Sequence, residues 1–283
     1  MKNKDLEQFI KDIQYKNRNP SDHKILEQLR DKATNTIYRL RENQILYRAR
    51  VIESRDSINT EAGFYGFPSG QCLAPPPHLT RDLRANYRFI PYLYCADDPY
   101  VSILETRPSF SDHVSVAELR VKKDLTVLDF SRQYGIVKVQ GEPYRSVKMT
   151  NKKADLFEEL SALFSKPVSQ RDDVVTYIPT QYIAEYVKNL GYDGIAYKSS
   201  LLTEDNIPDR HSVMKEAVPC NIVIFNHCDG VEAVCSNVYK ITNIQFDCKQ
   251  IDDGGKQKNI CNPMNAIMER IKKLEQKAPP NVR

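Results

Sequence analysis

One carboxylate, Glu105, lies where a helix disfavours it. The segment LYCADDPYVSILETRPS spans residues 93–109, and its aspartate pair followed by Pro99 is typical of a helix start. Pro108 ends this helix, because the residue before a proline is pushed out of the α region. Glu105 therefore falls in the last turn, where the helix dipole disfavours negative charge. A residue that breaks a local rule is often functional. The alternative is that Glu105 only pairs with Arg107 or lies in water.

Further polar residues adjoin the apolar segments in the middle of the chain. They are Arg48 and Arg50 in LYRAR, Arg84 in LRANYRF, Tyr94 in PYLY, and Ser199 and Ser200 at the end of DGIAYKSS. The alternation of LYRAR places its two arginines on one face of a strand. Taken singly, these residues are equally well explained by solvated arginines and a serine turn.

Composition and missing motifs exclude several classes of protein. The 283 residues, 41% hydrophobic and 28% charged, suit a globular chain with a sizeable core. The net charge of +4 does not call for a nucleic-acid partner. The sequence has no GxGxxG, GxxxxGK[ST], HExxH or GxSxG motif, and its five histidines are scattered, so we expect no metal. No signal peptide or membrane-spanning run is visible, and the seven cysteines form no CxxC pair, which favours a soluble cytoplasmic protein with reduced thiols.

The periodicity of apolar residues predicts an α+β chain with helical ends. We expect helices over residues 1–45 (broken at 19–22), 99–107, 154–165 and 180–190, the last closed by Gly191, and a final helix from Pro263. We expect strands at 45–52, 88–96, 114–121, 125–130, 192–197 and 221–226, a strand pair at 231–241 and 243–251, and a loop at 63–78. The apolar stripes of the terminal helices must either pack onto the central block or contact a second copy or an inhibitor.

The order of the motifs is more specific than any one of them. LYRAR, RAN, YLYCADDPYVSILETRP, TQYIAEYVKNLGYDGIAYKSS and NIVIF follow one another between about residues 45 and 226. This order resembles the RES-domain family, which is named for its Arg, Glu and Ser. The resemblance implies an ADP-ribosyltransferase-like fold of mixed or antiparallel sheets with flanking helices. It also implies a toxin of a toxin–antitoxin pair that degrades NAD⁺ by phosphorolysis or hydrolysis.

The resemblance also implies roles for individual residues. By position, the family's catalytic arginine and glutamate fall on Arg84 and Glu105, its NAD⁺-binding tyrosine and serine fall on Tyr94 and Ser199 (with Ser200 a close second), and a further NAD⁺-binding arginine falls on Arg48. Cleavage of the nicotinamide–ribose bond passes through an oxocarbenium-like state, which a fixed carboxylate stabilises. An arginine can bind phosphate through two parallel hydrogen bonds, and a tyrosine can stack on nicotinamide.

The implied organisation has three parts. They are a helical segment over residues 1–44, a catalytic domain over 45–227, and an extension over 228–283 with a strand pair and a helix. The expected partners are NAD⁺ as substrate, inorganic phosphate, an antitoxin protein and a second copy of the chain, with no cofactor, metal, membrane or nucleic acid. Two rival functions remain open. One is an ADP-ribosyltransferase acting on a protein or nucleic acid, and the other is a non-catalytic binding module.

Overall fold

The computed structural model describes residues 3–54, 61–131, 135–137, 145–147, 156–166, 174–202, 219–244, 250–251 and 257–258. The chain forms two compact units, residues 1–241 and 242–283. In the second unit, β11 (Gln250–Ile251) pairs with β12 (Gln257–Lys258). The final helix expected from Pro263 lies outside the described residues. Among the helices that are described, none has the length and apolar character needed to cross a membrane.

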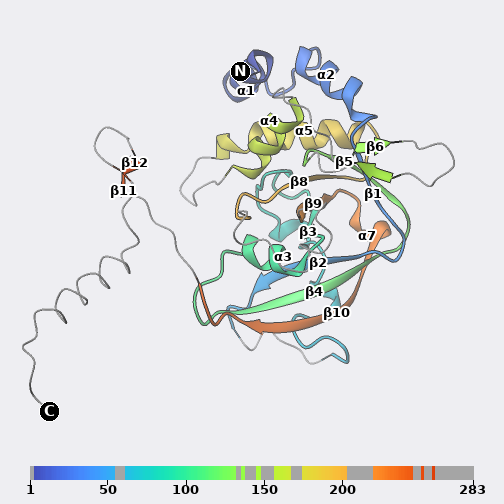
Figure 1. The fold of residues 1–283 in the computed structure, drawn as a ribbon, viewed down its shortest axis with the longest axis vertical. Coiled ribbons are helices and arrows are strands. Elements are labelled where there is room, and N and C mark those ends of the chain that lie inside the picture. The colour runs from blue at the N-terminus through green and yellow to red at the C-terminus, as the bar shows by residue number, and fades with distance from the viewer. Residues whose placement is uncertain are drawn as a thin grey trace, which may run out of the picture. The chain divides into compact units, whose positions relative to one another are not determined.

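An eight-stranded mixed sheet forms the centre of the first unit, in the order β1-β5-β8-β9-β3-β2-β4-β10 (Figure 1). Its strands are β1 (Ile37–Leu40), β2 (Ile45–Val51), β3 (Leu93–Ala96), β4 (His113–Val121), β5 (Leu125–Asp129), β8 (Gly194–Lys198), β9 (Cys220–Ile224) and β10 (Val231–Lys240). Only β5 and β8 are parallel neighbours, and the other pairs are antiparallel. A separate pair, β6 (Gly135–Val137) and β7 (Arg145–Val147), lies outside this sheet.

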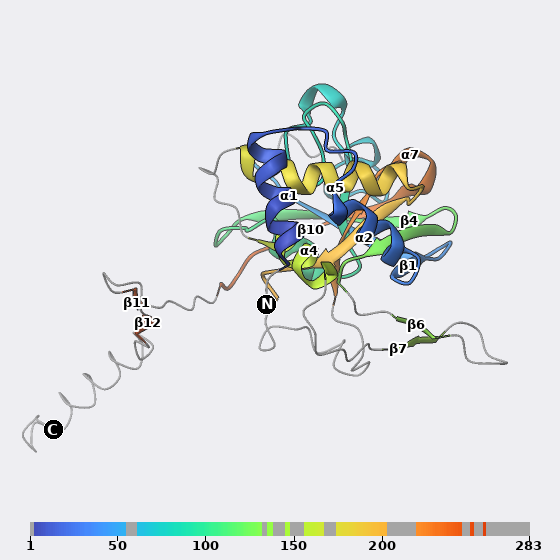
Figure 2. The ribbon, with the colours of Figure 1, turned by 90° about the horizontal axis from the view of Figure 1, so that it is seen from above.

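Four helices gather on one side of the sheet, as Figures 1 and 2 both show. They are α1 (Lys4–Tyr15), α2 (Lys24–Ala33), α4 (Leu156–Ser165) and α5 (Ile178–Asn189). Apolar residues of α1 and α2, including Phe9, Ile13 and Leu29, share one buried cluster with residues of α4, α5, β8 and β9. The stripes of the N-terminal helices are therefore covered by the rest of the unit. Gly191, at φ +90°, follows α5 as expected for a helix end.

The opposite side of the sheet is covered by the loop that joins β2 to β3. Its buried residues Phe64, Phe67 and Cys72 pack with the other faces of β4 and β9. In its described part the loop contains two single 3₁₀ turns, η2 (Ser69–Gln71) and η3 (Pro77–Leu79), as expected from its glycines and prolines. A third such turn, η4 (Val174–Thr176), precedes α5, and a one-turn helix, α7 (His227–Gly230), joins β9 to β10.

One expectation about the elements is wrong. Residues 37–40, predicted to continue the second helix, form β1 and pair with β5, because that pairing buries Leu40 completely. β10 pairs with β4 from Val231↔Val121 to Lys240↔His113, and most of the strand expected at 243–251 as its partner lies outside the described residues. Residues 1–44 and β10 belong to the same unit as the central block.

The sheet is weakly joined between β2 and β3. The two strands share a single register pair, Tyr47↔Ala96, whereas β2 pairs with β4 along all seven of its residues. The short helix α3 (Pro99–Glu105) packs at this place, against β2, β3, β4 and β9.

Candidate active site

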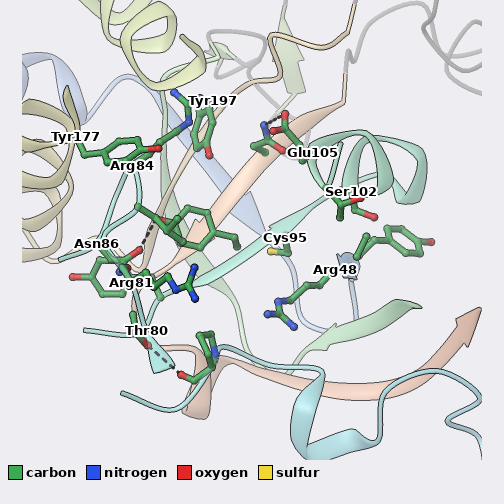
Figure 3. Close-up of a pocket in the computed structure, with 18 residues that line it drawn as sticks. Arg48, Thr80, Arg81, Arg84, Asn86, Cys95, Ser102, Glu105, Tyr177 and Tyr197 are labelled. Carbon is green, nitrogen blue, oxygen red and sulfur yellow. Dashed lines mark hydrogen bonds between the residues drawn. The ribbon is translucent and has the colours of Figure 1, made fainter. Parts of the chain in front are cut away.

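A cavity of about 360 Å³ lies at the gap between β2 and β3. Its wall includes residues of β2, the loop before β3, α3, β8 and β9 (Figure 3). Four of the five residues singled out by the sequence line it, namely Arg48, Arg84, Tyr94 and Glu105. A volume of this size is within the range of small-molecule sites.

Glu105 is the last residue of α3. As expected, the helix starts at Pro99, and the carboxylate of Asp98 accepts hydrogen bonds from the backbone N–H groups of Tyr100 and Val101. The Glu105 side chain is exposed to the open cavity. One of its oxygens, Oε1, accepts two hydrogen bonds, from Ser199 Oγ at 2.6 Å and from Asn221 Nδ2 at 2.7 Å. Ser199 and Asn221 thus hold the carboxylate, which does not fit the alternative that Glu105 only pairs with Arg107 or lies in water.

Ser199 and Ser200 differ sharply in their surroundings. Ser199 is buried, with 7% of its surface exposed, and its hydroxyl accepts a hydrogen bond from the backbone N–H of Leu201 while it donates to Glu105. Ser200 is exposed. Ser199 is not among the residues that line the cavity. Its contact with the site is the hydrogen bond to Glu105.

Tyr94 supports the loop that carries Arg84. Its hydroxyl donates to Oδ1 of Asn86 at 2.8 Å and accepts from the backbone N–H of Ala85 at 3.0 Å. Burial raises the pKa of Tyr94 well above its ordinary value, so the hydroxyl stays neutral. Gln181 of α5 holds the same loop by donating to the backbone oxygen of Asn86. The tyrosine ring lines the cavity, while its hydroxyl fixes the loop.

Three arginines reach the cavity, and they come from two places. Arg84 and Arg81 lie on the loop before β3, and Arg84 donates to the carbonyl oxygen of Phe164 at 2.7 Å. Arg48 extends from β2 and donates to the carbonyl oxygens of Gln71 and Cys72, each at 3.3 Å. Among the described residues, none of the three forms an ion pair. Their charges are therefore available to an anionic ligand.

The charge of Arg48 persists despite its surroundings. Burial, and next the nearby charge of Arg50, lower the pKa of Arg48 to about 10, so it remains protonated at neutral pH. Arg50 lies on the same face of β2, as predicted, and stacks over the ring of Phe67 at 4.1 Å. Two neighbouring cations without a carboxylate partner in the described residues are typical of an anion site.

Two cavity residues, Tyr197 and Asn221, were not singled out by the sequence. They are register partners on β8 and β9, so their side chains lie on the same face of the sheet. Tyr197 lies between Arg84 and Glu105 in Figure 3, and burial followed by the charge of Glu105 raises its pKa. The sequence offered only a weak signal for them, since each is a single polar group among the buried, mostly apolar residues of its strand.

No metal site is visible at this cavity. The ranges of the chain that the structure describes contain no group of three or more His, Cys, Asp or Glu residues that could hold a metal ion. The five cysteines placed by these ranges are free thiols: Cys72, Cys95, Cys220, Cys228 and Cys235.

Comparison with known proteins identifies the family to which the chain belongs. The model of the RES domain matches residues 45–247. Curated proteins gave no match. Among solved structures, a chain of the toxin–antitoxin complex MbcT–MbcA from M. tuberculosis is similar at 13% identity and a TM-score of 0.39, with 76% of this chain and 92% of that chain covered. Because the family model spans well over half of the sequence and contains every strand that lines the cavity, the chain belongs to the RES-domain family.

Proposed function

We propose that this protein cleaves the bond between nicotinamide and ribose in NAD⁺ and passes the ADP-ribosyl group to phosphate or water. One observation carries the proposal. A carboxylate, Glu105, is held by two hydrogen-bond donors in the same cavity as three arginines that form no ion pairs in the described residues. Membership of the RES-domain family supports the same activity.

The chemistry needs a fixed negative charge near the ribose. When the bond between C1′ and the nicotinamide nitrogen breaks, its electron pair goes to nicotinamide and positive charge grows on the ribose ring. The carboxylate of Glu105 stabilises that charge. An oxygen of phosphate or water then bonds to C1′ and, in the case of water, releases a proton to solvent. Nicotinamide leaves as a neutral base, so the reaction requires neither a metal nor a general acid.

The remaining cavity groups suit the rest of the substrate. The guanidinium groups of Arg48, Arg81 and Arg84 can bind the pyrophosphate of NAD⁺ or an incoming phosphate through paired hydrogen bonds. The neutral rings of Tyr94 and Tyr197 offer flat surfaces to nicotinamide. NAD⁺ is then a substrate, and no further cofactor is proposed.

The proposed role in the cell is that of a toxin of a toxin–antitoxin pair, acting in the cytoplasm and inhibited by an antitoxin protein. Expression of the protein alone should then lower cellular NAD⁺ and stop growth, whereas the Glu105→Gln variant should do neither. Growth arrest by both proteins at unchanged NAD⁺ would contradict this role.

The direct test is product analysis. The purified chain is incubated with NAD⁺, with and without inorganic phosphate, and the products are identified by mass spectrometry. We expect free nicotinamide, with ADP-ribose formed in water and its phosphorylated form when phosphate is the acceptor. Glu105→Gln keeps the shape of the side chain and removes its charge, so turnover should fall at least about a hundredfold.

The matched control is Glu42→Gln. Glu42 is exposed in the turn between β1 and β2, so the NAD⁺ turnover of the Glu42→Gln variant should equal that of the unchanged protein. Normal turnover of folded Glu105→Gln would contradict the assignment of the carboxylate. ADP-ribose attached to an added protein or nucleic acid, without free ADP-ribose, would instead identify a transferase.

A further inference from the structure

Asn221 occupies the centre of the sheet and reaches the cavity. It is the second residue of β9, and its register partners are Tyr197 on β8 and Ala96 on β3. Only 7% of its surface is exposed. Buried amides need hydrogen-bond partners, and the Nδ2 group of Asn221 donates to Glu105 Oε1 at 2.7 Å. Asn221 is thus a buried polar side chain in a central strand whose other residues are apolar.

The two donors to Glu105 converge on the same oxygen. Ser199 Oγ lies 2.6 Å from Oε1, and its own orientation is fixed by the backbone N–H of Leu201. In the part of the chain that the structure describes, Oε2 of Glu105 has no hydrogen-bond partner. One oxygen is therefore engaged by the protein, and the other is left for a ligand in the cavity.

An unsupported Glu105 would not keep one orientation. It is exposed, has a long flexible side chain, and ends a helix of seven residues. The last turn of a helix also disfavours negative charge, so the backbone does not hold the carboxylate in place. Ser199 and Asn221 both hold this carboxylate, and the backbone of Asn221 is fixed by a strand with neighbours on both sides.

We propose that Asn221 is a positioning residue for Glu105: its amide holds Oε1 and directs Oε2 toward the ribose of the substrate. The proposal rests on the proposed cleavage of NAD⁺, and it adds to that site a residue on β9, outside the arginine, tyrosine, glutamate and serine that the sequence indicates. Asn221 acts through the carboxylate and is not itself required to touch the reacting atoms.

The test is a double-mutant cycle measured by the kcat and KM of NAD⁺ cleavage. Asn221→Ala removes one hydrogen bond to a charged group, and we expect kcat to fall about 10- to 100-fold, with KM changed less than about threefold. Asn221→Asp replaces the donor by a second negatively charged acceptor, so its kcat should fall further than that of Asn221→Ala. In the Glu105→Gln background, whose residual turnover is followed over long incubations, Asn221→Ala should change kcat by less than about twofold.

Two controls separate positioning from stability. Asn226→Ala removes an exposed asparagine just beyond β9, and its kcat should be unchanged. Urea unfolding of each variant confirms that it is folded, and Asn221→Ser, which keeps a small polar group too short to reach Glu105, replaces Asn221→Ala if the latter does not fold.

The outcomes distinguish this proposal from the activity on which it rests. An unchanged protein that does not cleave NAD⁺, or a Glu105→Gln variant with normal turnover, overturns the proposed function. If Glu105→Gln is impaired but the Asn221 variants keep the kcat of the unchanged protein, the positioning role is overturned. An equal loss on substituting Asn221 in both backgrounds also overturns it, since that loss does not pass through the carboxylate.

Discussion

Substitution of Phe9 by alanine should destabilise the whole first unit of the chain. Phe9 lies in the middle of α1 and is completely buried. Its ring contacts the ring of His23 at a centroid distance of 5.3 Å and that of Tyr182 on α5 at 5.9 Å. The residue therefore links both N-terminal elements to a helix that lies about 170 positions later in the sequence.

The magnitude follows from the burial of the ring. Replacing a fully buried phenylalanine by alanine removes its transfer free energy and leaves a cavity, which together cost about 3–5 kcal/mol. With a urea dependence of about 2–3 kcal/mol per molar, the midpoint of unfolding should fall by about 1–2.5 M. Tyr15 on the same helix is 76% exposed, so Tyr15→Ala should change the free energy of unfolding by less than about 0.5 kcal/mol.

Urea unfolding followed by circular dichroism measures both variants. The reasoning is refuted if Phe9→Ala unfolds at the same urea concentration as Tyr15→Ala. It is also refuted if a chain lacking residues 1–40 stays folded, because that deletion removes α1, α2 and the edge strand β1 together. Either result would favour the alternative, in which the apolar face of the N-terminal helices contacts a second copy of the chain or an inhibitor.

Two further predictions concern single polar groups. Ser199→Ala should lower NAD⁺ turnover about tenfold or more because it removes a donor to Glu105, whereas Ser200→Ala, at an exposed position, should leave turnover unchanged; equal effects in the same assay would contradict the assignment. Burial raises the pKa of Asp97 from 3.8 to about 6, so between these values the folded chain binds a proton that the unfolded chain does not, and stability falls as pH rises through this window. Relative to the unchanged protein, the free energy of unfolding of Asp97→Asn should therefore rise by about 2 kcal/mol between pH 4 and pH 7.5 in urea unfolding, and a constant difference between the two proteins would disprove this.

Elements with strong local signals were predictable from the sequence. The helix that ends at Glu105 has a capping aspartate, a proline at its first position and a proline after its end, all of which act within a few residues. The strands β2, β4, β5 and β9 also lie where their apolar patterns place them. The motif order was enough to identify the family and four residues that line the cavity.

Features that depend on distant parts of the chain were not predictable. Ile37 and Leu40 are spaced as on a helix, and only the pairing of β1 with β5 makes the segment a strand. The pairing of β10 with β4 was not foreseen, because a sequence pattern indicates that a strand exists but not which strand it joins. The bond from Asn221 to Glu105 joins residues 116 positions apart, and nothing near either residue indicates it.

The position of β9 in the sheet has a consequence for the order in which the chain is synthesised and folds. The strand lies between β8 and β3, yet it is made after both of them and after every arginine of the cavity. Until residues 220–224 leave the ribosome, β3 and β8 have no common neighbour, so a shorter nascent chain cannot close the sheet around the cavity. Under the proposed function, incomplete chains released by stalled ribosomes would leave cellular NAD⁺ intact, and activity would begin only once this central strand has been inserted.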